Sequence, residues 1–160
     1  AQLYIFCKNL SGNIVDFGAG AGFPGAVLSI LGASKIILVE SNKKKCKFLT
    51  KLKKETNSNF KIVNSRIENL DFLDPSLIVS RALTSTKNLL FFSIDHMLKS
   101  KKINSKREAI KNLPNLLFLK GKSFKNELND MPENLKIKFQ AFPSITSAES
   151  RILLYNKNIL

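Results

Sequence analysis

Short apolar runs alternate along the chain with longer stretches in which apolar residues recur at helical spacing. Runs such as Ile36–Val39 are bounded by polar residues and are typical of buried strands. The pattern predicts strands at 13–17, 35–40, 60–64, 77–80 and 116–119, with further candidates at 135–141 and 151–156. It predicts helices at 24–32, 43–56, 86–98 and 122–130, a short turn or helix at 66–70, and the end of a helix at 1–8.

Strands that alternate with helices favour an α/β fold with a mostly parallel sheet and helices on both faces. The last two candidate strands have no helix between them, so we expect an antiparallel hairpin at one edge of the sheet. No internal repeat and no second domain is visible, and we expect residues 1–160 to form one domain.

A glycine-rich segment follows the first predicted strand. Residues 14–25 read IVDFGAGAGFPG, which predicts a buried strand, a tight turn and a helix start. A helix N-terminus behind such a turn favours a negatively charged or polar ligand group. Open α/β sheets bind ligands at the carboxyl ends of their strands, so the segment predicts a nucleotide-cofactor pocket.

The spacing of the glycines bears on which cofactor binds. Gly20, Gly22 and Gly25 fit the dinucleotide pattern G-x-G-x-x-G, but the strand ends before Gly18, which puts that pattern out of register. The segment reads D-x-G-x-G-x-G instead, with Asp16 near the end of the strand. A carboxylate there suits the positive ammonium and sulfonium of S-adenosylmethionine better than a pyrophosphate. The pattern resembles the first motif of class I methyltransferases, and it assigns Asp16, Gly18, Gly20 and Gly22 to the cofactor.

Glu40 ends the second apolar run. An acidic residue at this place can accept hydrogen bonds from ribose hydroxyls, in nicotinamide enzymes and methyltransferases alike. Glu40 therefore supports an adenosine cofactor without choosing between the two. A nicotinamide cofactor and a purely structural glycine turn stay open as alternatives.

The chain is strongly basic, with 26 Lys and Arg against 12 Asp and Glu and a formal net charge of +14. Such an excess favours a nucleic-acid partner, although the abundance of Lys, Asn and Ile also fits an AT-rich genome. Lysines crowd the predicted helix at 43–56, while Cys46, Leu49 and Leu52, with Phe48, would face the sheet. Its lysine face is either an RNA surface or simply solvated. The basic stretch 99–111 is likewise an exposed loop with a short helix or a disordered insertion.

Other features exclude several classes of protein. No apolar run reaches the length of a membrane span, and no signal peptide is visible. Cys7 and Cys46 lack metal-ligand spacing and indicate a reduced, cytoplasmic setting, so we expect no metal and no membrane partner. The chain begins inside an apolar stretch, and we interpret residues 1–10 as the end of a missing amino-terminal helical portion.

The residues that are present narrow the kinds of methyl transfer that this chain could catalyse. Methylation at carbon 5 of a pyrimidine needs a cysteine nucleophile, and neither cysteine follows a strand beside the pocket. The Asn/Asp-Pro-Pro-aromatic signature for exocyclic amines is absent, since residues 80–83 read SRAL. No base for a ribose hydroxyl is evident, and His96 lies near a helix end. Guanine N7 carries no proton, so its methylation is compatible with catalysis by positioning, without a catalytic residue.

The residues at 16–25 resemble the D-[VI]-G-[ST]-G-x-G-[LF]-P-G motif of the bacterial 16S rRNA guanine-N7 methyltransferases, the RsmG (GidB) family. Further segments agree in order: Glu40-Ser41 before the lysine-rich helix, SRIE at 65–68, SRA at 80–82 and LKG at 119–121. The resemblance covers roughly residues 12–156. It implies a class I methyltransferase (Rossmann-like) fold, S-adenosylmethionine as cofactor, and methyl transfer to a guanine N7 in the 530 loop of 16S ribosomal RNA, with that RNA or the small ribosomal subunit as partner.

The resemblance also implies site residues. Cofactor contacts fall on Gly18 and Phe23, on Ile67 and Glu68 near the adenine, and on Arg81, which would bind the methionine carboxylate or an RNA phosphate and is the one possible contributor to catalysis. Arg66 and Arg81 would have only a structural role if they paired with acids such as Glu40 or Glu68. We assign RNA contacts to Lys44, Lys45 and Lys120. Three alternatives stay open: methylation of another substrate, a nicotinamide-type oxidoreductase, and a non-catalytic RNA-binding relic.

Overall fold

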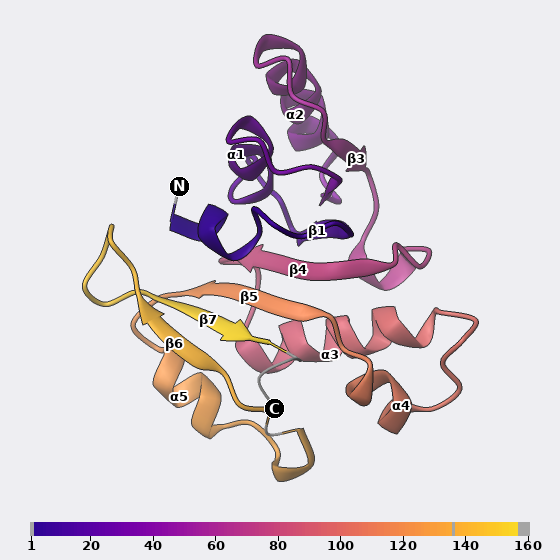
Figure 1. Cartoon of the computed structure of the whole chain (residues 1–160), viewed down its shortest axis with the longest axis vertical. Helices are drawn as coiled ribbons and strands as arrows, with labels where there is room; N and C mark the ends of the chain where they lie inside the picture. Colours follow the sequence, from indigo (N-terminus) through magenta and orange to yellow (C-terminus); the bar gives the residue numbers. More distant parts are fainter. Residues whose placement is uncertain (1, 136, 157–160) are drawn as a thin grey trace.

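The structure, a computed structural model, describes residues 2–135 and 137–156 (Figure 1). Seven strands form one sheet in the order β3-β2-β1-β4-β5-β7-β6. The five strands from β3 to β5 run parallel, and β7 and β6 are antiparallel additions at one edge. The strands are β1 (Asn13–Phe17), β2 (Ile36–Val39), β3 (Lys61–Val63), β4 (Pro75–Arg81), β5 (Asn115–Lys120), β6 (Gln140–Pro143) and β7 (Arg151–Tyr155).

The helices connect and cover these strands. The α-helices are α1 (Gly25–Ile30), α2 (Lys43–Glu55), α3 (Thr86–Leu98), α4 (Lys106–Lys111) and α5 (Phe124–Asn129). Three short 3-10 helices are η1 (Gln2–Phe6), η2 (Ile67–Asn69) and η3 (Glu133–Leu135). In Figure 1 the elements β1, α1, α2 and β3 lie on one side of β4, and α3, α4, β5, α5, β6 and β7 lie on the other.

Successive residues of β1 enter two different apolar layers. Val15 and Phe17 pack in the cluster formed with α3, α4 and α5, whereas Ile14 packs in the cluster formed with η1, α1 and α2. All three side chains are fully buried. A parallel strand with both faces covered needs apolar residues at nearly every position, which explains the continuous run that the sequence shows. The predicted fold class is confirmed, including the terminal hairpin.

Most predicted elements lie within a few residues of the observed ones, but one predicted strand is wrong. The segment 135–141 was expected to be extended, whereas η3 ends at Leu135 and β6 begins only at Gln140. Leu135, Ile137 and Phe139 alternate as strand residues do, yet they pack against the α3 side of the core without pairing to a neighbouring strand. Residue 136 lies outside the described residues.

Helix α2 matches its prediction closely. Asn42 caps its N-terminus by accepting hydrogen bonds from the backbone nitrogens of Lys44 and Lys45. Cys46 and Leu49 are buried against the sheet, but the Phe48 side chain is half exposed rather than inward. The basic stretch 99–111 contains a turn followed by α4, whose N-cap is Ser105. Within residues 2–135 and 137–156, no helix has the length and apolar character needed to cross a bilayer.

Candidate functional site

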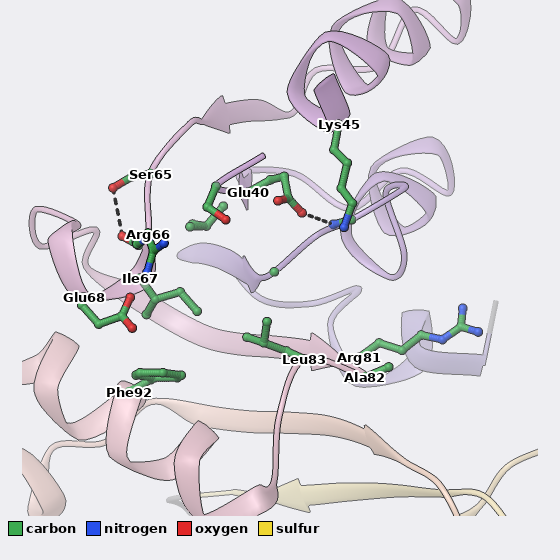
Figure 2. Close-up of a pocket in the computed structure, with 14 residues that line it drawn as sticks. Glu40, Lys45, Ser65, Arg66, Ile67, Glu68, Arg81, Ala82, Leu83 and Phe92 are labelled. Carbon is green, nitrogen blue, oxygen red and sulfur yellow. Dashed lines mark hydrogen bonds between the residues drawn. The ribbon is translucent and has the colours of Figure 1, made fainter. Parts of the chain in front are cut away.

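A cleft of about 440 Å³ opens at the carboxyl ends of β1, β2, β3 and β4 (Figure 2). Its walls come from four chain segments that are distant in sequence, together with one residue each from α2 and α3. The lining residues are Gly18 and Gly20, Val39 to Ser41, Lys45, Ser65 to Glu68, Arg81 to Leu83, and Phe92. Parallel strands bring their carboxyl ends to one edge, which is why these segments converge there.

The glycine loop takes a backbone shape that other residues rarely adopt. Gly18, Gly20 and Gly22 all have positive φ, at 74°, 57° and 95°. A Cβ on Gly18 would lie 2.7 Å from Cδ1 of Leu83 across the cleft, and a Cβ on Gly22 would lie 2.8 Å from Cβ of Ala26. Gly18 therefore keeps the cleft open, while Gly22 lets α1 pack closely behind the loop. Gly22 itself does not line the cleft.

Glu40 is held in place by the glycine loop that it faces. Its Oε2 accepts a hydrogen bond from the backbone nitrogen of Gly20 at 2.9 Å, and its Oε1 accepts one from that of Asn42 at 2.8 Å. The side chain is only 6 % exposed and lines the cleft. Each carboxylate oxygen has a second lone pair, so Glu40 can still accept from two neighbouring hydroxyl groups. This is the geometry that a ribose diol requires.

Asp16 does not lie in the cleft, in contrast to its predicted place beside a cationic cofactor. Its side chain is fully buried, and Oδ2 accepts a hydrogen bond from the backbone nitrogen of Gly25 at 2.8 Å. Burial raises its pKa to about 7; the Gly25 hydrogen bond lowers it, and the charge of Glu40 raises it further. The pleat of β1 turns Asp16 toward α1, so the residue ties the glycine loop to the helix start.

The turn after β3 forms the opposite wall. Ile67 and Glu68 from η2 lie beside Phe92 of α3, across the cleft from Glu40 and Lys45 (Figure 2). The predicted adenine-side residues are thus brought to the same cleft as Glu40. The side-chain amide of Asn64 donates to the carbonyls of Glu40 and Ser41, which joins the ends of β2 and β3.

Arg81 separates the main cleft from a second cavity of about 310 Å³, which it also lines. Its guanidinium carbon lies 5.5 Å from the ring centroid of Phe23, which lines the second cavity and is 51 % exposed. Phe23 is not part of the main cleft. In the described part of the chain no carboxylate lies within ion-pair distance of Arg66 or Arg81, so neither arginine is neutralised by Glu40 or Glu68.

The three lysines assigned to RNA lie in different environments. Lys45 lines the cleft, and Lys44 is exposed nearby on α2. Lys120 is only 8 % exposed and forms an ion pair with Oε2 of Glu127 at 2.7 Å while donating to the carbonyl of Thr84 at 2.7 Å. The prediction that Lys120 contacts RNA needs correction, because its ammonium is already engaged inside the fold.

The histidine and both cysteines lie outside the cleft lining. His96 is buried, and its Nε2 accepts a hydrogen bond from the backbone nitrogen of Leu73 at 3.1 Å. Burial, with the charge of Lys99, lowers its pKa to about 4. Cys7 and Cys46 are buried outside the cleft lining. No group of three or more residues suited to a metal ion occurs within the described ranges.

Phe92 and Leu83 are among the lining residues that were not predicted as site residues. Phe92 follows Phe91 in a helix that is apolar on several faces, so the sequence gives no sign of which ring reaches the cleft. Leu83 lies two residues after the end of β4 and is half exposed, with its methyl groups against Gly18. The contact between Leu83 and Gly18 becomes visible only when the ends of β1 and β4 lie side by side in the sheet.

Comparison with known proteins decides the family. The sequence model of a family described as rRNA small subunit methyltransferase G (GidB) matches residues 1–153. The chain belongs to this family. A ribosomal RNA small subunit methyltransferase G from Rickettsia prowazekii is 32 % identical over 155 residues, which are 97 % of this chain and 73 % of the relative. The predicted family is therefore confirmed, and with it the enzyme class, an S-adenosylmethionine-dependent methyltransferase.

Solved structures show the same fold. A putative methyltransferase, yhhF, from Escherichia coli has a TM-score of 0.64 at 16 % identity, covering 96 % of this chain and 82 % of that one. Magnesium protoporphyrin IX methyltransferase from Synechocystis, solved with bound SAM, has a TM-score of 0.60 at 13 % identity, covering 96 % of this chain and 74 % of that one. These likenesses support the Rossmann-like methyltransferase fold of the rRNA small subunit methyltransferase G family.

Proposed function

We propose that this protein transfers a methyl group from S-adenosylmethionine to N7 of a guanine in 16S ribosomal RNA, in its 530 loop as the family resemblance implies. One observation carries the cofactor part of the proposal. Glu40, at the end of β2, lines the cleft while the amide of Gly20 holds its carboxylate opposite the adenine-side turn at Ile67 and Glu68. A pocket with a fixed diol acceptor between a glycine loop and an apolar wall fits an adenosine.

The residues would divide the cofactor between them. Glu40 would accept from the ribose hydroxyls, while Ile67 and Glu68, with Phe92, would contact the adenine and its amino group. Gly18 and Gly20 would let the backbone approach the ligand closely. Asp16 and Gly22 would act indirectly, by fixing the loop and the start of α1.

Arg81 and Phe23 are suited to the acceptor side. A guanidinium against an exposed aromatic ring is a surface on which an unstacked base can lie. Because Arg81 borders both cavities, a base held in the smaller one would lie next to the cofactor cleft. Arg81 would donate to a phosphate or to guanine O6, and it leaves N7 unprotonated for attack.

Methyl transfer to guanine N7 requires no acid–base or covalent catalysis by side chains. Bound S-adenosylmethionine supplies an electrophilic methyl group on its sulfonium. Guanine N7 carries a free lone pair, so no residue has to remove a proton, which agrees with a lining that offers no histidine or cysteine among its described residues. The chain contributes by binding both partners and by aligning them.

Charge favours RNA as the acceptor. The chain carries a formal net charge of +14, and Lys45, Arg66 and Arg81 line the cleft itself. Lys44 extends this positive rim along α2. Binding through such groups falls steeply with salt, because phosphate contacts release condensed counterions.

Two measurements test the proposal. Calorimetry should show binding of S-adenosylmethionine and none of NADH. Labelled cofactor should then transfer its methyl group to 16S RNA, offered naked and as the small subunit, and cleavage chemistry specific for N7-methylguanosine should map it. Binding of NADH alone, or a methyl group on another atom, would refute the proposal. Cofactor binding without transfer to either substrate would indicate a non-catalytic RNA-binding protein.

A further inference from the structure

Lys99, at the end of α3, holds the turn that forms the adenine-side wall of the cleft. Its Nζ donates to the carbonyl oxygens of Glu68 at 2.7 Å, Leu70 at 2.6 Å and Ile67 at 3.4 Å. An ammonium carries three donor hydrogens, so each carbonyl is matched by one. The half-buried Lys99 therefore uses all three ammonium hydrogens to bind the backbone of one short turn.

The turn needs an external partner. Helix η2 has three residues, and the backbone nitrogens of Asn69 and Leu70 donate to the carbonyls of Arg66 at 3.1 Å and Ile67 at 3.2 Å. A single 3-10 turn has poor hydrogen-bond geometry and no cooperative length to support it. A cation beside its last carbonyls also complements their partial negative charge.

The contact goes to the backbone and not to the acidic side chain of the turn. No carboxylate of a described residue lies within ion-pair distance of Lys99. The Glu68 carboxylate is thus left in the cleft lining, beside Ile67 and Phe92 (Figure 2). Phe92 precedes Lys99 by seven residues on α3, which places both on one face of the helix. The same face of α3 therefore supplies Phe92 to the cleft wall and Lys99 to hold the neighbouring turn.

We propose that Lys99 is a positioning residue for cofactor binding: its ammonium fixes the Ile67–Leu70 backbone so that Ile67 and Glu68 are preorganised for the adenine. The inference rests on the proposed function of the cleft. It separates Lys99 from the other lysines of the basic stretch 99–111, whose exposed members Lys101 and Lys102 make no side-chain hydrogen bond within the described structure. Those lysines are free for solvent or phosphate, whereas Lys99 acts inside the protein.

The test compares Lys99→Met with Lys101→Met. Both remove one positive charge from the same segment, but only the first removes a backbone tether. We expect Lys99→Met to raise the calorimetric Kd for S-adenosylmethionine about tenfold, since hydrogen bonds to charged groups are among the stronger ones. Amide exchange at residues 67–70 should accelerate, while the KM for RNA stays unchanged. Lys101→Met should leave the cofactor Kd and this exchange unchanged.

Two further variants keep the test decisive. Lys99→Arg retains the charge and several donors and should recover part of the cofactor affinity. Lys99→Gln, with two donors and no charge, should fall between Lys99→Arg and Lys99→Met, and it serves if Lys99→Met does not fold. Equal cofactor affinity and equal exchange in Lys99→Gln, Lys101→Met and the unsubstituted chain would overturn the inference, as would a change in RNA KM without a change in cofactor Kd.

A failure of the proposed function would give a different result from a failure of the Lys99 inference. An unsubstituted chain that binds no S-adenosylmethionine would remove the role assigned to the cleft. Exchange at residues 67–70, measured without any ligand, would still report whether Lys99 orders the turn.

Discussion

The backbone nitrogen of Gly25 donates to Oδ2 of Asp16 at 2.8 Å, a contact that spans the whole glycine loop. It joins the penultimate residue of β1 to the first residue of α1 and leaves the other carboxyl oxygen, Oδ1, without a partner in the described structure. The loop is thereby closed from behind, on the side away from the cleft. Asp16 fixes the loop beside the cleft but does not line the cleft itself.

Asp16→Ala should lower the free energy of unfolding by about 1–3 kcal/mol, because it leaves a buried N–H without an acceptor. Cofactor affinity should fall as well, since the loop loses its tie to α1. Chemical denaturation and calorimetry measure the two effects. Asp16→Asn keeps one acceptor for Gly25 and serves as the control. Asp16→Ala with unchanged stability would show that the contact does not matter.

Gly18→Ala should weaken cofactor binding more than it weakens the fold. Its φ of +74° costs an L-residue roughly 1–3 kcal/mol, and the new methyl group would push the Leu83 side chain into the cleft. Gly121→Ala is the matched control, because nothing lies within 4 Å of a Cβ there. Leu83→Ala in the Gly18→Ala background should restore part of the affinity. No recovery would mean that the clash is not the cause.

Glu40→Gln should raise the Kd for S-adenosylmethionine about tenfold or more. The carboxylate accepts from Gly20 and Asn42 with its two oxygens, and the amide of Gln would turn a donor toward one of those N–H groups. Glu55→Gln removes an equal charge at the exposed end of α2, where Glu55 forms an ion pair with Lys51, and should leave binding unchanged. Equal Kd values for the two variants would exclude Glu40 from the cofactor site.

Arg81 and Phe23 should act as one unit on the RNA side. Arg81→Met and Phe23→Leu should each lower kcat/KM for RNA about tenfold while changing the cofactor Kd far less. Because the stack needs both partners, the double variant should lose less than the product of the two single losses. Fully multiplicative losses, or a loss confined to cofactor binding, would contradict a shared acceptor surface.

Sequence patterns located the elements because the apolar runs of β1, β2, β4 and β5 are buried on both faces. They failed at 135–141 because alternation reports which side chains are inward, and Leu135, Ile137 and Phe139 are inward without a partner strand. The Phe139 ring lies 5.9 Å from that of Phe118, so side-chain packing helps to fix the segment. The sequence pattern of a single segment does not show whether another strand pairs with it.

The site was predictable where backbone geometry demands particular residues. The three positive-φ glycines and the acid after β2 could be read directly, and Glu40 lies where it was expected. Asp16 could not be placed, because alternation fixes that it shares a face with Ile14 but not which helix covers that face. Lys120 was misplaced for a related reason. Its partner Glu127 comes from α5, and only the fold brings the two together.

Two buried titratable groups should give the stability of this protein opposing pH dependences. Burial raises the pKa of Asp16 to about 7, so the folded protein binds a proton that the unfolded chain releases near the ordinary aspartate pKa of 3.8. Stability from this group is full below about pH 4 and is lost as the pH rises through 7. Burial, with the charge of Lys99, lowers the pKa of His96 to about 4 from 6.5. Stability from this group is full above pH 6.5 and is lost as the pH falls toward 4.

Each group contributes a slope of up to about 1.4 kcal/mol per pH unit, and between pH 4.5 and 6.5 the two slopes have opposite sign. Asp16→Asn removes the first, so denaturation of that variant should show stability that increases with pH across this window. His96→Gln keeps an acceptor for the Leu73 amide and removes the second, so its stability should decrease with pH. The unsubstituted chain should be flatter than either. Parallel profiles for the two variants would show that these side chains do not titrate as their burial requires.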